Sequence, residues 1–193
     1  MKAIGITGGI GSGKSIIGKI LEVMGYPVFY SDAEAKLLMT RDPELKKGLI
    51  HLLGEAAYSG DELNRSYISG RLFSDPAVKK SIDELVHPAT YRAFDKWKAK
   101  QTSALVFLES ALMFETGSYK RFDYTILIIA DHPTKIERII QRDNIKHEQV
   151  IERMNNQLPD EKKVVLADFI IDNSSHKMII PQLLNILNKI TNR

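Results

Sequence analysis

A glycine-rich segment near the start of the chain constrains the fold more than any other feature. Residues 8–15 read GGIGSGKS, which matches the spacing G-x-x-x-x-G-K-[ST]. A short apolar run, Lys2–Thr7, precedes the segment, and an apolar-periodic run, Ser15–Met24, follows it. This is the order strand, loop, helix in which the spacing binds phosphate. The alternative is a glycine-rich turn that merely joins a strand to a helix, and the matching context disfavours it.

The chemistry of the segment assigns a role to each of its residues. Glycines let the backbone curl so that successive N–H groups point at phosphate oxygens, and the following helix presents its positive end to them. The side chain of Lys14 then reaches the β and γ phosphates, and the hydroxyl of Ser15 ligates magnesium. The residues expected to bind a nucleoside triphosphate are Gly9, Ile10, Gly11, Ser12, Gly13, Lys14 and Ser15.

Four further apolar runs predict strands, each separated from the next by helical patterns. They are Pro27–Tyr30, Ala104–Leu108, Tyr124–Ala130 and Phe169–Ile171. The last three are continuously hydrophobic, as strands covered on both faces are. We therefore expect an α/β fold of the P-loop NTPase type, with a five-stranded parallel sheet and helices on both faces.

The stretch between the second and third predicted strands is helical with polar breaks, which predicts a helical insertion over residues 36–100. Ser31 and Glu34 have the spacing of a capping box, so Asp32 is expected in the first turn of a helix. The pair His87-Pro88 predicts a helix boundary. Beyond it, Tyr91, Phe94 and Trp97 are expected to lie in the core of the helical insertion, and the alternative is a platform on which a ligand stacks. Further along the chain, residues 133–167 are expected to contain charged helices.

Composition excludes several classes of protein. The chain has no cysteine, which removes disulfides, thiolate nucleophiles, thiolate zinc sites and iron–sulfur clusters. The net charge is +3 without a block of like charge, which argues against a nucleic-acid partner. The longest purely apolar stretch, residues 126–130, is far shorter than the roughly 20 residues of a membrane span. We expect a cytoplasmic protein without a membrane partner.

A set of motifs resembles the dephospho-CoA kinase family in order and spacing. The matching segments are TGGIGSGKS at 7–15, SDA at 31–33, VHP at 86–88, LMFE at 112–115, QRD at 141–143, residues 153–157 and ADFIIDN at 167–173. The match covers nearly the whole chain. Two positions depart from the family pattern: Ala111 stands where the family has proline, and Glu109 stands where aspartate is common.

The resemblance implies an enzyme that phosphorylates the ribose 3′-hydroxyl of dephospho-CoA with ATP, the last step of coenzyme A biosynthesis. It implies Mg²⁺ bound with ATP, and a monomer or small homo-oligomer. Residues 1–193 would form one kinase domain. The nucleotide-binding core would comprise 1–35, 101–131 and 168–193, the substrate-binding insertion 36–100, and a mobile lid 132–167.

Asp32 and Arg142 are the other expected catalytic residues beside Lys14. Asp32 follows the second strand, at the edge of the sheet where ligands bind, and a carboxylate there can orient the acceptor hydroxyl and take its proton. The alternative for Asp32 is an acid favoured by the helix dipole. Arg138 and Arg142 are four residues apart and share a helix face, so they can converge on one polyanion. Their alternative is a solvated surface.

The remaining expected site residues each have a simpler alternative. Glu109 ends the third strand, as a carboxylate that holds magnesium does, although acids at strand ends are common. Asn173 follows the fifth strand and could read the adenine edge of ATP, or form an Asn turn. By resemblance, His87 belongs to the acceptor pocket, and Arg142 is the arginine of the lid and binds ATP. Arg138 and Arg153 are expected to join Asp32 and His87 in binding the acceptor.

Two rival functions remain open from the sequence. One is another nucleoside or nucleotide kinase, which differs in its acceptor. The other is a P-loop switch or a nucleic-acid-linked ATPase, which needs no small acceptor for turnover.

Overall fold

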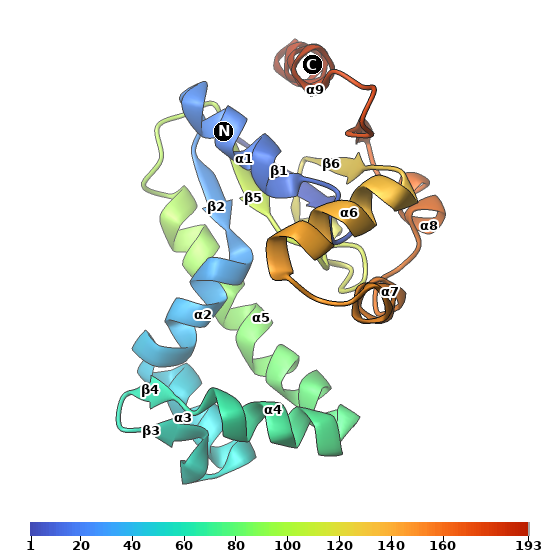
Figure 1. Cartoon of the computed structure of the whole chain (residues 1–193). Coiled ribbons are helices and arrows are strands. Elements are labelled where there is room, and N and C mark those ends of the chain that lie inside the picture. Colours follow the sequence, from blue (N-terminus) through green and yellow to red (C-terminus); the bar gives the residue numbers. More distant parts are fainter. Residues whose placement is uncertain (193) are drawn as a thin grey trace. The chain divides into compact units, whose positions relative to one another are not determined.

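The computed structural model describes residues 1–192 and divides the chain into two compact units (Figure 1). The sheet unit contains Met1–Phe29 and the chain from Thr102 onward, and the helical unit contains Tyr30–Gln101. Arg193, the last residue of the expected core, lies outside the described residues.

A five-stranded sheet organises the first unit. Its strands are β1 (Lys2–Gly8), β2 (Val28–Tyr30), β5 (Leu105–Glu109), β6 (Tyr124–Ile129) and β7 (Phe169–Asp172). They lie in the order β2-β5-β1-β6-β7, and β1 pairs in parallel with both β5 and β6. The five strands predicted from the apolar runs are confirmed. The glycine-rich segment therefore leaves the sheet from the carboxyl end of its central strand, where open α/β sheets bind ligands.

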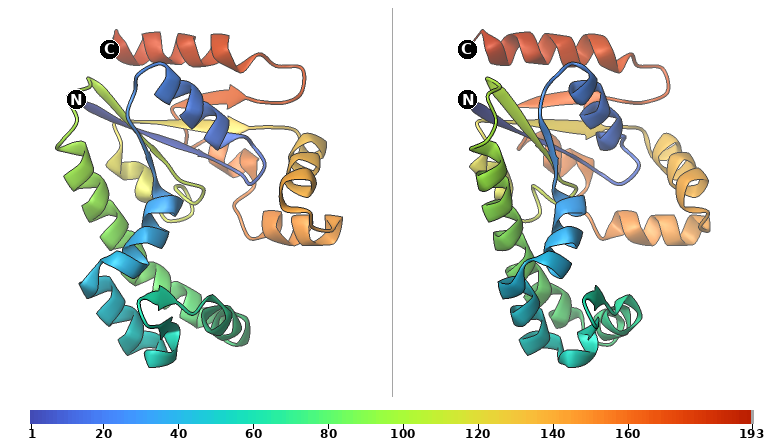
Figure 2. Two further views of the ribbon diagram at one scale, coloured as in Figure 1. Left: turned by 60° about the vertical axis from the view of Figure 1, so that its left-hand side comes forward. Right: turned by 90° about the vertical axis from the view of Figure 1, so that its left-hand side faces the viewer.

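Helices cover both faces of the sheet, as expected (Figure 2). Alternate residues of β1 point to opposite faces. On one face, Ile4 and Ile6 pack in a fully buried core with α1 (Lys14–Val23) and α9 (Ile179–Thr191). On the other face, a Cβ on Gly5 would lie 2.4 Å from Sδ of the buried Met113, and the short helix α8 (Asp160–Val164) packs against β6.

Two helices follow β6. Helix α6 (His132–Asp143) begins where the Asp131 carboxylate accepts the Thr134 N–H at 2.9 Å, a standard N-cap. It ends at Asn144, whose φ of +50° turns the chain into α7 (His147–Asn155). These elements and α8 fall where the sequence predicts charged helices.

The second unit is built from helices and one short hairpin. Its elements are α2 (Ser31–Arg41), α3 (Pro43–Leu53), a 3₁₀ turn (Glu55–Ala57), β3 (Tyr58–Ser59), β4 (Glu62–Leu63), α4 (Arg65–Ser74) and α5 (Pro76–Lys98). Within α5, Phe94 is buried and its ring stacks on that of Trp97 at 5.9 Å between centroids. Phe94 therefore lies in the core, as predicted, and Trp97 is half-buried.

Two local predictions are wrong. Pro88 lies inside the continuous helix α5 instead of ending one. A proline inside a helix costs about 3 kcal/mol, but buried residues at helical spacing continue across it into one core cluster: Val78, Ile82, Val86 and Ala89. Burying each valine or isoleucine contributes about 1.5–3 kcal/mol, which outweighs the proline.

The capping box at Ser31 is also absent. Ser31 is the first residue of α2, and Tyr30 occupies the N-cap position without a side-chain hydrogen bond. Strand β2 runs directly into α2, so no extended residue remains between them for a serine cap. Asp32 is still a first-turn residue.

None of the helices within residues 1–192 combines the length and apolar character needed to cross a membrane.

Candidate active site

The loop between β1 and α1 has a backbone that favours glycine at two positions. Gly11 and Gly13 have φ of +78° and +95°, in the left-handed region. A Cβ on Gly13 would lie 2.2 Å from Nδ2 of Asn173, and one on Gly11 would lie 2.7 Å from the carbonyl oxygen of Lys135. The glycines therefore give both the curl of the loop and the space for neighbouring groups.

The side chain of Lys14 lies across this loop. Its ammonium donates hydrogen bonds to the carbonyl oxygens of Gly8 and Gly9, at 2.9 and 3.2 Å. Helix α1 starts at Lys14 with no side-chain cap and no acidic residue in its first turn. The positive end of the helix is thus not neutralised by an acid of its own and is suited to an anion.

Two predicted residues, Asn173 and Arg138, contact the second half of the loop. Asn173 is buried just after β7, and its amide Nδ2 donates to the carbonyl oxygen of Ser12 at 2.8 Å. Arg138, two turns into α6, donates from Nη2 to the carbonyl oxygen of Asn173 at 3.0 Å, with a longer contact of 3.5 Å from Nη1 to that of Gly11. The structure brings these two predicted residues together at the loop.

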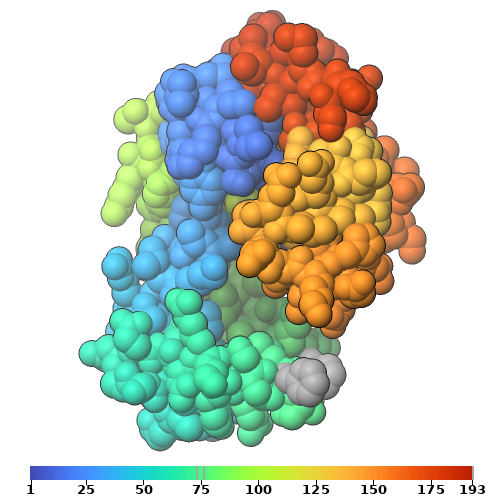
Figure 3. Space-filling model, in the orientation of Figure 1, coloured from blue at the N-terminus to red at the C-terminus, as the bar shows by residue number. Residues whose placement is uncertain are grey.

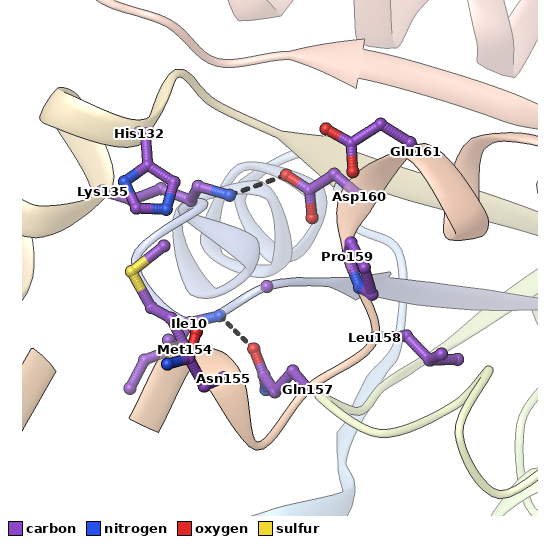
Figure 4. Close-up of a pocket in the computed structure, with 11 residues that line it drawn as sticks. Ile10, His132, Lys135, Met154, Asn155, Gln157, Leu158, Pro159, Asp160 and Glu161 are labelled. Carbon is purple, nitrogen blue, oxygen red and sulfur yellow. Dashed lines mark hydrogen bonds and ion pairs between the residues drawn. The ribbon is translucent and has the colours of Figure 1, made fainter. Parts of the chain in front are cut away.

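The first half of the loop meets residues to which the sequence assigned no role (Figure 4). Oε1 of Gln157 accepts the Ile10 N–H at 2.8 Å. The ammonium of Lys135 and Oδ2 of Asp160 form an ion pair at 2.7 Å. These side chains line a cavity of about 350 Å³ that is also bounded by Gly9. Gln157 belongs to the matching segment 153–157, and that was the only sequence signal for it.

Arg142 and Arg153 meet one turn beyond Arg138, around a single carboxylate. Asp143 accepts hydrogen bonds from Nε of Arg142 and from Nη1 of Arg153, both at 2.7 Å. Hydrogen bonds from the Arg142 guanidinium lower the pKa of Asp143 and in return raise the pKa of Arg142. The Arg142 side chain is 60% exposed, so its remaining donors can face a ligand. Figure 3 shows the surface of α6 adjoining the N-terminal segment that carries the loop.

The predicted metal ligands belong to segments of two neighbouring strands: Glu109 ends β5, and Ser15 lies in α1, which follows β1 and the loop. Ser15 is exposed in the first turn of α1. Glu109 is the last residue of β5, is 8% exposed and pairs in register with Ile6 of β1. Among residues 1–192, no group of three or more His, Asp and Glu side chains could hold a metal ion by itself.

Asp32 and His87 belong to the helical unit. Asp32 lies in α2, two residues after β2 ends at Tyr30. His87 lies in the middle of α5, with Nε2 at 3.9 Å from Oδ1 of Asp83 and its side chain 34% exposed. Their acceptor-binding roles stay predictions.

Within the sheet unit, the arrangement can bind a polyphosphate. Loop N–H groups, the N-terminus of α1, Lys14 and Arg138 supply positive charge or hydrogen-bond donors around one loop. Phosphate binding alone does not identify the group that receives the phosphate.

Comparisons with known proteins extend this result. The family model described as dephospho-CoA kinase matches residues 2–178. A protein named dephospho-CoA kinase from Bacteroides fragilis is 37% identical over 185 residues, which is 95% of this chain and 90% of that protein. A crystal structure of a protein from Thermus thermophilus has a TM-score of 0.86 and 32% identity, covering 98% of this chain and 97% of that one.

A dephospho-CoA kinase structure from Campylobacter jejuni has a TM-score of 0.70 and 24% identity, again over 98% of this chain and 97% of that one. At this identity the likeness supports the fold alone. The family follows from the family model and from the Bacteroides fragilis relative.

Proposed function

Because the chain belongs to the dephospho-CoA kinase family, we propose that it transfers the γ-phosphoryl group of ATP to the ribose 3′-hydroxyl of dephospho-CoA. The products are coenzyme A and ADP, and the reaction is the last step of coenzyme A biosynthesis. The observation that carries the proposal is the phosphate-binding loop between β1 and α1, within a chain whose residues 2–178 match the family.

The loop binds the triphosphate of ATP. Its N–H groups and the N-terminus of α1 meet the phosphate oxygens, and Lys14 places its ammonium on the β and γ phosphates. Asn173 and Arg138 hold the second half of the loop.

Magnesium fits the oxygen donors at this site. Mg²⁺ is usually held by one or two protein oxygens together with substrate phosphates. The exposed hydroxyl of Ser15 and the carboxylate of Glu109 would supply those oxygens. When bound, the ion would neutralise charge on the β and γ phosphates.

Asp32 orients the acceptor. As a carboxylate in the first turn of α2, it can accept a hydrogen bond from the 3′-hydroxyl and take its proton during transfer. His87 and Arg153 contribute to the binding of dephospho-CoA. In-line attack then needs only that the two substrates be held with the reacting oxygen and phosphorus aligned.

Arg142 acts from the charged region, residues 132–167, which closes over the substrates as a lid. Asp143 holds the guanidinium of Arg142 by two hydrogen bonds, and the other donors remain for phosphate oxygens. Closure excludes water, which would otherwise accept the phosphoryl group.

The proposal is tested by supplying MgATP with one acceptor at a time: dephospho-CoA, AMP, adenosine or pantetheine phosphate. Mass spectrometry of the products should show a phosphate added to dephospho-CoA alone. The matched control is Lys14→Ala, which should lower turnover by several orders of magnitude without unfolding the chain, because it removes a charge from the transferring group and no buried core side chain. Phosphorylation of a different acceptor, or ATP hydrolysis that needs no acceptor, would contradict the proposal.

A further inference from the structure

Gln157 makes the contact that holds the first half of the phosphate-binding loop. The Ile10 N–H donates to a side chain 147 residues further along the chain, at 2.8 Å. Because a backbone N–H can only donate, the atom that faces Ile10 must be the oxygen of the glutamine amide. Gln157 lies in the connection between α7 and α8, residues 156–159.

Buried ion pairs fix this connection from the side that follows Gln157. Oε1 of Glu115 accepts the N–H of Leu158 at 3.0 Å and lies 2.8 Å from the ammonium of Lys163, whose side chain is fully buried. Asp160 pairs with Lys135, which is 8% exposed. Gln157 itself donates its backbone N–H to the carbonyl oxygen of Met154 at 3.1 Å. The side chain is therefore presented to Ile10 from a held backbone.

Groups outside the loop thus hold both of its halves. Asn173 holds the carbonyl of Ser12 in the second half, and Gln157 holds the N–H of Ile10 in the first half. Inside the loop, Ser12 N–H donates to the carbonyl of Gly9 at 3.1 Å. Donors that are fixed before the ligand arrives lose less conformational entropy on binding.

A glutamine suits position 157 both because its side chain is uncharged and because it is long enough to reach Ile10. Its oxygen accepts the N–H without bringing a negative charge to a loop that must receive a triphosphate. A glutamate would accept the same hydrogen bond and repel the phosphates, and an asparagine is one methylene shorter.

We infer that Gln157 is a positioning residue for nucleotide binding. It sets the conformation of the first half of the loop through Ile10, and it must be uncharged. The inference deepens the proposed function and rests on it only in taking ATP as the ligand.

The experiment measures the affinity for MgATP by calorimetry, with no acceptor present, in Gln157→Ala, Gln157→Asn and Gln157→Glu. Loss of one neutral hydrogen bond should weaken binding about three- to tenfold in the alanine and asparagine variants. The glutamate variant should bind more weakly still at about 0.1 M salt, and the difference should shrink at about 1 M, where charges are screened beyond about 3 Å.

The matched control is Gln149→Ala. Gln149 is an exposed residue of α7 whose Oε1 accepts the N–H of Lys146 at 3.1 Å, a bond of the same kind away from the loop. This variant should bind MgATP as the wild type does. Circular dichroism checks that each variant is folded, and the glutamate variant, which keeps the size of the side chain, carries the test if the alanine variant unfolds.

Three outcomes would overturn the inference. The first is wild-type affinity for MgATP in the alanine and asparagine variants. The second is tighter binding of MgATP by Gln157→Ala, which would mean that the contact competes with phosphate. The third is a loss of MgATP affinity in Gln157→Glu that does not depend on salt. A wild-type protein that binds MgATP but does not phosphorylate dephospho-CoA would contradict the proposed function and leave the role of Gln157 to be decided by these affinities.

Discussion

Replacing Glu115 by glutamine should strongly destabilise the sheet unit, because it removes the charge that compensates Lys163. The Lys163 side chain is fully buried and its ammonium lies 2.8 Å from Oε1 of Glu115, which is 17% exposed. Glutamine keeps the size of the side chain and an oxygen that can still accept the N–H of Leu158. The substitution therefore tests the charge and little else.

The expected loss follows from the burial of the ammonium. Breaking a buried ion pair by removing one partner costs about 3–5 kcal/mol, because the other charge stays buried without compensation. At about 2–4 °C per kcal/mol for a chain of this length, the melting temperature should fall by roughly 6–20 °C. Since whole domains are stable by about 5–15 kcal/mol, this is a large fraction of the total.

The reverse substitution, Lys163→Met, should be milder. It removes the buried ammonium and leaves a carboxylate that keeps its hydrogen bond from Leu158, on a side chain that is 17% exposed. We expect a loss of about 1–3 kcal/mol. The double variant, with methionine at 163 and glutamine at 115, should be more stable than Glu115→Gln alone, because no charge is then left unpaired.

Differential scanning calorimetry of the four proteins at one pH and salt concentration measures these differences. A melting temperature of Glu115→Gln within about 2 °C of the wild type would refute the reasoning, since the ammonium would then not depend on the carboxylate. A greater loss in Lys163→Met than in Glu115→Gln would also refute it.

Three further predictions concern the reaction and its charged groups. Asp32→Asn should lower turnover about 10²–10⁴-fold with little change in ATP affinity, because it removes only the proton acceptor. Steady-state kinetics and calorimetry measure the two quantities, and loss of ATP binding without loss of turnover would contradict that role. Arg142→Lys should lower kcat about 10- to 100-fold at saturating substrates, because an ammonium cannot replace the planar guanidinium, which donates two hydrogen bonds at once. A wild-type kcat would remove Arg142 from the site. A larger loss of kcat in Arg138→Lys would assign the role to Arg138, one helical turn earlier. Because Arg142 lowers the pKa of Asp143, the carboxylate stabilises the fold fully above its ordinary pKa of about 3.9 and loses this effect as the pH falls through the lower folded pKa. An NMR titration should find the Asp143 midpoint below 3.9 in the wild type and higher in Arg142→Ala, and an unshifted wild-type midpoint would contradict this.

Features set by local sequence were predictable. The apolar runs gave the strands, because a strand covered on both faces must be hydrophobic at every position. The spacing of glycines and Lys14 gave the strand, loop and helix, because the loop's curl depends on residues adjacent in the chain.

Features set by distant partners were not predictable. Lys135 and Lys163 lie in segments that the sequence predicts to be charged helices, and both are buried because acids from other elements reach them. The contact of Gln157 with Ile10 likewise joins two segments that no local pattern connects. Helix α5 continues through Pro88 because buried residues on both sides of the proline pack into one core cluster. The prediction of a helix boundary from the pair His87-Pro88 takes no account of such packing.

The stack of Trp97 on Phe94 gives the protein a built-in optical reporter. Trp97 is the only tryptophan of the chain, and it lies in the helical unit. Its emission therefore originates in the unit that carries Asp32 and His87, whereas the far-ultraviolet circular dichroism sums the helices of both units. Following both signals through a denaturant titration distinguishes melting of the helical unit from melting of the unit with the phosphate-binding loop, without introducing a label.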